Sequence, residues 1–322
     1  MQASVAAVSA KRESETHQLI CGDVLEQLDL IKGQRFRLVI SSPPYNIGKD
    51  YEKDTRRSLV EYTEWHREIV LRLSDLLEPD GSICWQVGNF VRNGIYIPLD
   101  IALYPIFSDL GFKLRNRVIW RFNFGRNSEK RLSGRYETLL WFTKSDSYKF
   151  NLDPIRVPQL YPGKRHSSKK GQAKAGLPSG NPQGKNPSDF WEFSAERDFL
   201  ENPIWDLPNV KSNHPEKTVH TCQFPIELAE RCVLAFTDEG DRVLDPFIGT
   251  GSSAIAALKH NRFAVGIDRD KSFLNIAEER LLALNEGTLP MRPSGLPVRR
   301  PRPNEKVAQV PLEWMPAPVN PV

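Results

Sequence analysis

Cysteine is scarce in this chain of 322 residues, and its four cysteines form no Cys-x-x-Cys pair. They lie far apart, at Cys21, Cys84, Cys222 and Cys232. Dispersed cysteines are typical of reduced thiols in the cytoplasm, and this spacing argues against a zinc site. Long apolar runs are also missing, since no segment approaches the roughly eighteen residues that a membrane-spanning helix needs. The N-terminus lacks the apolar core of a secretory signal. We therefore expect a cytoplasmic protein that binds no metal and does not span a membrane.

Acidic residues are absent from one long segment, although the net charge of the chain is only +4. From Arg156 to Ser188 there are seven Lys or Arg residues and no Asp or Glu, among many Gly, Pro, Ser, Asn and Gln. One interpretation is a flexible, solvated loop. The other is a surface that faces a polyanion. In that case the candidate phosphate contacts are Lys164, Arg165, Lys169, Lys170, Lys174 and Lys185.

The rest of the chain alternates short apolar runs with segments of helical periodicity. The expected strands are 18–21, 36–40, 82–87, 114–122, 136–143, 242–244 and 262–267. The expected helices are 59–77, 97–110, 225–236, 253–260 and 273–284. This alternation predicts an α/β fold with a doubly wound, mostly parallel sheet, and the runs 114–122 and 136–143 predict an antiparallel pair at its edge.

The second half of the chain contains a candidate nucleotide-cofactor loop. Strand 242–244 runs into Asp245-Pro246-Phe247-Ile248-Gly249-Thr250-Gly251, and a helix follows. Such a turn places backbone N–H groups and the positive end of a helix beside an anionic ligand, and its glycines let the ligand approach closely. Ser252 and Ser253 can cap the helix or bind a carboxylate. Asp268, 17 residues beyond Gly251, can accept two hydrogen bonds from ribose hydroxyls.

Two alternatives remain for this unit. A dinucleotide-dependent oxidoreductase would have a third glycine three residues after the second, where this chain has Ala254, and its fingerprint does not include the leading Asp-Pro-Phe. The other alternative is a plain turn followed by a solvated strand end.

A second turn, Ser42-Pro43-Pro44-Tyr45, directly follows the strand at 36–40. Two prolines fix φ and remove two N–H donors, so this turn presents carbonyl oxygens in a rigid array. If Ser42 and the Pro43 carbonyl hold the two hydrogens of an exocyclic amine, its lone pair becomes free to attack a methyl group. The same oxygens stabilise the positive charge that develops on nitrogen, and Tyr45 can stack on the base. The alternative is a proline-rich surface turn.

Together these residues resemble the amino-group DNA methyltransferases of restriction–modification systems. In that family the catalytic motif is Asp, Asn or Ser, then Pro-Pro and an aromatic residue, as at residues 42–45, and the cofactor motif is Phe-x-Gly-x-Gly, as at residues 247–251. The catalytic motif comes first here, as in the circularly permuted β group. The resemblance implies the class I methyltransferase fold and S-adenosyl-L-methionine as cofactor. It also implies that residues 220–225, including Gln223 and Pro225, touch the methionine part, and that Asp23 contacts the adenine side.

The resemblance further implies the substrate and the partners. Ser as the first motif residue favours cytosine N4 over adenine N6, with the base flipped out of double-stranded DNA at a cost of a few kcal/mol. It suggests a type II modification enzyme, acting at a GC-rich palindrome and paired in function with a restriction endonuclease that it need not contact. The motif order argues against protein glutamine or RNA methyltransferases. A non-catalytic DNA-binding module is the alternative from another class, and a monomer and a homodimer both remain open.

The domain organisation follows from these assignments. We expect a flexible N-terminus (1–16), a catalytic half (17–155), a target-recognition region (156–213) where periodicity fails, and a cofactor-binding half (214–285). The last segment, 286–322, is rich in proline and is expected to be poorly ordered.

Overall fold

A computed structural model describes residues 16–48, 56–122, 128–159, 161–167, 174–191, 210, 214–220 and 222–292. Eight strands form one sheet, in the order β1 (His17–Cys21), β10 (Phe263–Asp268), β9 (Arg242–Asp245), β2 (Phe36–Ser41), β3 (Leu77–Val87), β7 (Tyr136–Thr143), β6 (Lys113–Arg121) and β8 (Phe190–Trp191). The first five are parallel to one another, and β7 is antiparallel to both of its neighbours. The predicted mostly parallel sheet with an antiparallel pair is confirmed, and the two-residue β8 lies beyond that pair.

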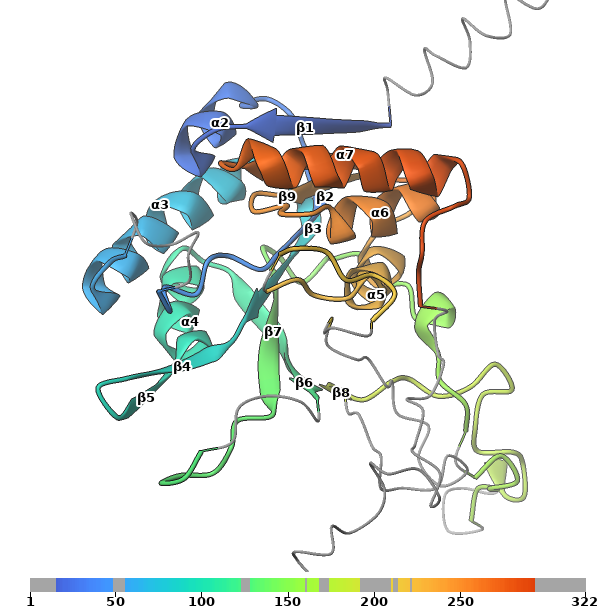
Figure 1. Cartoon of the computed structure of the whole chain (residues 1–322). Coiled ribbons are helices and arrows are strands. Elements are labelled where there is room, and N and C mark those ends of the chain that lie inside the picture. Colours follow the sequence, from blue (N-terminus) through green and yellow to red (C-terminus); the bar gives the residue numbers. More distant parts are fainter. Residues whose placement is uncertain are drawn as a thin grey trace, which may run out of the picture.

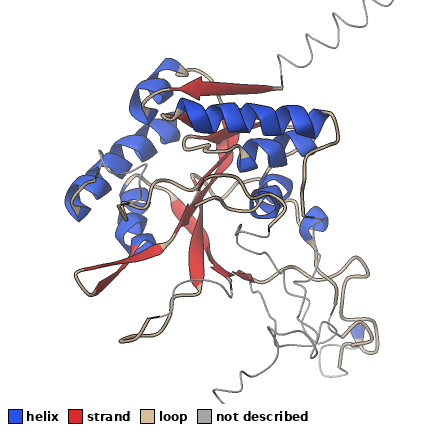
Figure 2. Cartoon of the chain, in the orientation of Figure 1, coloured by secondary structure: helices blue, strands red, loops and turns tan. Residues whose placement is uncertain are grey.

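Helices cover both faces of the sheet (Figures 1 and 2). One face carries α5 (Ile226–Phe236), α6 (Ser252–Lys259) and α7 (Lys271–Asn285), and the other carries α2 (Val24–Leu30), α3 (Leu59–Leu76) and α4 (Leu99–Asp109). Successive side chains of β2 alternate between the two cores: Leu38 and Ile40 join the first, and Val39 joins the second. The fold is therefore doubly wound, as the sequence predicted.

Two local elements were missed by the periodicity. Helix α2 is short, and Asp23 caps it by accepting a hydrogen bond from the backbone N–H of Leu25 (2.9 Å). A hairpin of β4 (Asn89–Arg92) and β5 (Ile95–Pro98) precedes α4, the helix predicted at 97–110, and no element was predicted at residues 89–96. Its signal was the Asn93-Gly94 pair, because both residues adopt the positive φ that a tight hairpin turn needs.

The two sequence motifs leave neighbouring strands. Strand β2 pairs with β9 in parallel, with Leu38 opposite Val243 and Val39 opposite Leu244. Residues 42–45 and 246–251 therefore emerge side by side at the carboxyl edge of the sheet. At this point the sheet continues in two directions, to β3 on one side of β2 and to β9, β10 and β1 on the other. Open α/β sheets bind ligands at such a position. None of the helices within the described ranges has the length and apolar content of a membrane span.

Candidate active site

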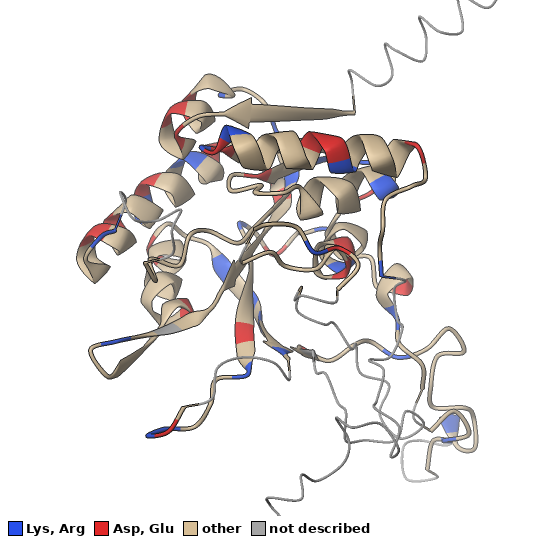
Figure 3. Ribbon diagram, in the orientation of Figure 1, with Lys and Arg blue, Asp and Glu red and all other residues tan. Residues whose placement is uncertain are grey.

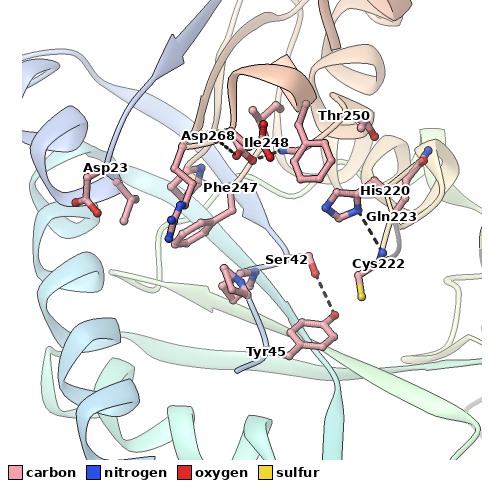
Figure 4. Close-up of a pocket in the computed structure, with 18 of the residues that line it drawn as sticks. Asp23, Ser42, Tyr45, His220, Cys222, Gln223, Phe247, Ile248, Thr250 and Asp268 are labelled. Carbon is pink, nitrogen blue, oxygen red and sulfur yellow. Dashed lines mark hydrogen bonds between the residues drawn. The ribbon is translucent and has the colours of Figure 1, made fainter. Parts of the chain in front are cut away.

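A cavity of about 430 Å³ lies between the two motifs, within the usual size range of ligand sites. Figure 4 shows Ser42 and Tyr45 on one side and Phe247, Thr250 and Asp268 on the other. Its lining includes these predicted site residues: Asp23, Ser42, Pro43, Pro44, Tyr45, Gln223, Pro246, Phe247, Gly249, Thr250, Ser252 and Asp268. The two turns that are some two hundred residues apart in sequence therefore share one cavity. Pro225, Asp245 and Gly251 do not line it.

Asp245 connects the two motifs from beneath the cavity. Its side chain is 2% exposed and accepts hydrogen bonds from Ser41 Oγ (2.5 Å), Ser253 Oγ (2.5 Å) and the backbone N–H of Phe247 (3.0 Å). Burial raises the pKa of this carboxyl to about 6. Asp245 therefore ties the end of β2 to the start of the glycine loop, and its contact with the cofactor stays a prediction.

Gly251 and Pro225 also have structural roles, through the conformation of the backbone. Both serve as N-caps, Gly251 of α6 with φ 85° and Pro225 of α5. A Cβ on Gly251 would lie 3.0 Å from the Cβ of Ala277, so this glycine permits close packing of the loop on α7. The expected capping by Ser252 and Ser253 is not found, because Ser252 Oγ donates to the Phe224 carbonyl (3.1 Å) and Ser253 Oγ to Asp245.

Asp268 ends β10 at the cavity and fixes the glycine loop. Its two carboxylate oxygens accept hydrogen bonds from the backbone N–H groups of Gly249 and Asp270, both at 2.9 Å. Burial raises the pKa of Asp268, and these two hydrogen bonds oppose the rise. Because each carboxylate oxygen has a second lone pair, this side chain can still accept ribose hydroxyls.

Aromatic rings form the walls on either side of the loop. Phe247 packs against Trp65 of α3 (ring centroids 5.5 Å apart), and the Arg57 guanidinium lies 4.4 Å from the centroid of the Trp65 ring. On the other side His220 meets Phe273 edge-on at 4.6 Å, and burial lowers the pKa of His220 to about 4. His220 is therefore neutral at pH 7.

Gln223 is held by its own loop. Its side-chain oxygen accepts from Thr218 Oγ1 (2.8 Å), and its amide donates to the Glu216 carbonyl (2.9 Å). The predicted methionine-side element is thus fixed at the cavity wall, while Thr221 lies outside the described residues.

The Ser-Pro-Pro-Tyr turn rests on a polar network that the sequence did not reveal. Ser42 Oγ and Tyr45 Oη are 3.0 Å apart, and the Tyr45 hydroxyl donates toward Gln86 Oε1 (2.8 Å) and Glu137 Oε2 (3.2 Å). The Gln86 amide also donates to Glu137. The signal in the sequence was a polar residue within each of two strongly apolar strands, Gln86 near the end of β3 and Glu137 near the start of β7.

Packing fixes the same turn from two more directions. Tyr45 is only 8% exposed, and a Cβ on Gly88 would lie 2.8 Å from its ring, so residue 88 has no room for a side chain. Burial, and next the charge of Glu137, raises the pKa of Tyr45 well above its usual value. The Tyr62 hydroxyl donates to the Pro44 carbonyl (2.8 Å) and so sets the orientation of the second proline.

This network determines which way the Ser42 hydroxyl points. Tyr45 has one hydroxyl proton, and two acceptor oxygens, on Gln86 and Glu137, face it. Since that proton is directed to them, Ser42 donates its own proton to Tyr45 Oη. Both lone pairs of Ser42 Oγ are then left to accept hydrogen bonds from a group in the cavity.

The predicted phosphate contacts lie away from this cavity. Lys164, Arg165, Lys174 and Lys185 belong to the segment shown at the lower right of Figure 1, where short backbone bridges join Val157 to Lys185 and Arg165 to Pro178. Lys169 and Lys170 lie outside the described residues, as do residues 1–15 and the tail from residue 293. The part of the chain that the structure describes contains no group of His, Cys, Asp and Glu that could hold a metal ion.

Residues 36–279 match the family model described as DNA methylase. The chain belongs to this family. Among its relatives, the type II methyltransferase M.BglII of Bacillus subtilis is 45% identical over 261 residues, which cover 81% of this chain and 67% of the relative. M.ScaI of Streptomyces caespitosus is 33% identical over 81% of this chain and 80% of the relative. The DNA adenine methyltransferase YhdJ of Escherichia coli is 26% identical, over 83% of each chain.

Solved structures agree with the fold of this DNA methylase. A proposed DNA modification methylase of Thermus thermophilus, in complex with S-adenosyl-L-methionine, is 25% identical with a TM-score of 0.54, over 83% of this chain and 94% of that one. PvuII DNA methyltransferase (cytosine-N4-specific) has a TM-score of 0.61 over 85% and 93%, and at 17% identity the likeness concerns the fold alone. The cofactor of this DNA methylase is S-adenosyl-L-methionine, and the acidic strand end, the glycine loop and the start of α6 fit it.

Proposed function

We propose that this DNA methylase transfers a methyl group to the exocyclic N4 of a cytosine flipped out of double-stranded DNA. The observation that carries the proposal is the shared cavity, because it holds an array of acceptor oxygens next to the cofactor loop. Bound S-adenosyl-L-methionine supplies the electrophilic methyl group. Holding the two reactants in line can contribute up to about 7–11 kcal/mol toward the barrier.

In the proposed mechanism Ser42 Oγ and the Pro43 carbonyl accept the two hydrogens of the amine. The orientation of the Ser42 hydroxyl toward Tyr45 supports this role, because it keeps the Ser42 lone pairs directed to the base. The amine nitrogen becomes tetrahedral, and its lone pair attacks the methyl carbon as the bond from that carbon to sulfur breaks. Solvent takes the surplus proton from the methylated nitrogen. The oxygens stabilise the positive charge that develops on nitrogen. Tyr45 contributes one face of its ring to the base.

On the cofactor side, we assign Asp268 to the ribose hydroxyls and Asp23 to the adenine side. Gly249 and Thr250, just before α6, and Ser252, its first residue, line the cavity and would hold the methionine carboxylate together with Gln223. Pro246 and Phe247 provide the apolar wall.

DNA recognition is assigned to residues 156–213, between the catalytic half (17–155) and the cofactor half (214–285). The cations at 164, 165, 169, 170, 174 and 185 would contact phosphates, which position the protein on the duplex without reading its sequence. The type II relatives support a function that protects DNA from a partner restriction endonuclease in the cytoplasm.

Adenine N6 is the second candidate for the methylated atom. It is favoured by the relative from E. coli, whose name assigns it to adenine. Both amines present two hydrogens on a ring, so Ser42 and Pro43 could hold either. Serine in the first motif position supports cytosine.

One experiment separates the two candidates. The purified protein is incubated with unmethylated plasmid DNA and S-adenosyl-L-methionine carrying a labelled methyl group, and the DNA is digested to nucleosides. The expected product is N4-methyl-2′-deoxycytidine, identified by mass and retention time. Label in N6-methyladenine would replace the cytosine proposal with its alternative, and the absence of any labelled nucleoside would reject the activity.

A further inference from the structure

Two projections of the chain flank the catalytic turn. The β4–β5 hairpin follows β3, and the connection from β6 to β7, described from Ser128 onward, precedes β7. Strand β7 runs antiparallel to β3, with Val87 opposite Thr138, so both projections leave the sheet at the edge where residues 42–45 follow β2. Glu137, the second residue of β7, contacts Tyr45 directly. Figure 1 shows both projections extending from the same end of the sheet.

Electrostatic effects on one tyrosine place the hairpin near the start of β7. Burial raises the pKa of Tyr96 in β5 to about 12, and its hydrogen bond to Tyr136, the first residue of β7, adds to the rise. Arg131 lies close enough to Tyr96 to act in the opposite direction. We call residues 92–96 and 128–136 the target rim.

The target rim combines exposed apolar side chains with cations. Leu132 is 93% exposed and Ile95 is 66% exposed. Lys130 and Arg131, next to Leu132, are also exposed, and Glu129 is the one acidic residue in the sequence from 128 to 136. Figure 3 shows both basic and acidic residues at the tip of the connection that precedes β7. Single exposed leucines are common on protein surfaces, but one that adjoins two cations beside the catalytic turn suits a partner that is anionic outside and apolar inside.

We propose that the target rim binds duplex DNA beside the flipped base, with Leu132 entering the base stack and Lys130 and Arg131 binding the flanking phosphates. The inference rests on the proposed function, because a base that leaves the stack creates a gap there. Apolar side chains inserted between base steps are a known way to stabilise such distorted DNA. The excess of cations favours DNA over a second copy of the chain, because two positively charged rims would repel each other.

The first test compares Leu132→Ala with Leu30→Ala, a control leucine that is 76% exposed at the end of α2, away from the rim. The wild-type protein first methylates plasmid DNA, so that the modified site can be mapped. A short duplex with that site is then compared with the same duplex carrying a mismatch opposite the target base. A mismatched base needs less energy to leave the helix.

We expect Leu132→Ala to lower kcat/KM on the matched duplex by about ten- to a hundredfold, in line with the few kcal/mol of unpairing, and to have little effect on the mismatched duplex. Leu30→Ala should behave as wild type on both. An equal loss on the two duplexes, or no loss on either, would overturn the role of Leu132. If the wild type methylates no DNA, the proposed function fails first and this inference fails with it.

The second test concerns the cations and the alternative occupant. Arg131→Ala should make the slope of log affinity against log salt shallower by about 0.9, the value for one phosphate contact. An unchanged slope would remove Arg131 from the interface. Sedimentation of wild type and Leu132→Ala examines self-association. The substitution could dissociate a dimer and leave the ratio of kcat/KM on the matched duplex to kcat/KM on the mismatched duplex unchanged. In that case the target rim is an interface between copies and the DNA proposal is wrong.

Discussion

Changing Glu137 to Gln tests how the polar network acts on Ser42. The substitution keeps the shape of the side chain and replaces a carboxylate with an amide, which can donate to Tyr45 Oη. The Tyr45 proton then keeps Gln86 Oε1 (2.8 Å) as its remaining acceptor in the network, and for part of the time it turns to Ser42 Oγ, 3.0 Å away, where it occupies a lone pair that the amine needs. Glu137 lies 3.2 Å from Tyr45 Oη and also accepts from Gln86, so the change reaches the whole network.

The expected magnitude follows from the hydrogen bonds involved. A hydrogen bond to a charged group contributes about 1.5–3 kcal/mol, and removing one group that stabilises a transition-state charge costs about 2.7–4 kcal/mol. Because the Pro43 carbonyl remains, only part of this is lost. We expect the rate of methyl transfer to fall by about tenfold to a hundredfold, which corresponds to about 1.4–2.8 kcal/mol.

Single-turnover transfer of labelled methyl measures the rate, and calorimetry measures affinity for S-adenosyl-L-methionine, which should stay unchanged. Glu279→Gln, the same chemical change at an exposed position of α7 away from the network, is the matched control. If Glu137 acts through Ser42, Ser42→Ala with Glu137→Gln should be no slower than Ser42→Ala alone. An unaltered rate in Glu137→Gln, a matching loss of cofactor affinity, or strictly additive losses in the double variant would refute the reasoning.

Three further predictions concern the site and the core. Ser42→Ala should cut the transfer rate far more than cofactor affinity, and equal activity would remove Ser42 from the mechanism. Asp268→Ala should weaken S-adenosyl-L-methionine binding in calorimetry by at least about tenfold, since hydrogen bonds to a carboxylate contribute about 1.5–3 kcal/mol; unchanged affinity would mean that the cofactor site is misassigned. His66 is buried among aromatic rings, and burial lowers its pKa to about 3. In the unfolded chain a histidine has a pKa of about 6.5, so the unfolded chain binds a proton at His66 more readily than the folded one. Below a pH of about 6.5 the free energy of unfolding should therefore fall by up to about 1.4 kcal/mol per pH unit. Urea unfolding between pH 7 and pH 4.5 should show a shallower pH dependence in His66→Phe than in wild type, with His166→Phe as control, and identical slopes would contradict the assignment.

Local sequence determined the elements and the two motifs. Periodicity, turn residues and caps act within a few positions, so most strands and helices were predictable, including the buried face of α3 with Tyr62, Ile69 and Leu73. The hairpin at residues 89–98 was missed because its two strands have only four residues each, too few for a clear alternation, and the Asn93-Gly94 turn is its main signal.

Only the tertiary structure shows which residues of distant strands contact one another. Asp245 and Asp268 look alike in the sequence, since each ends a strand near the glycine loop. The order of the strands separates them: Asp245 is enclosed between β2 and α6, where two serines bind it, while Asp268 opens on the cavity. Glu137 meets Tyr45 for the same reason, because β7 pairs with β3 across more than fifty positions of sequence. The sequence alone therefore determined which chemical groups are available, and the pairing of strands determined which of them meet, since that pairing depends on the free energy of the whole core and not on neighbouring residues.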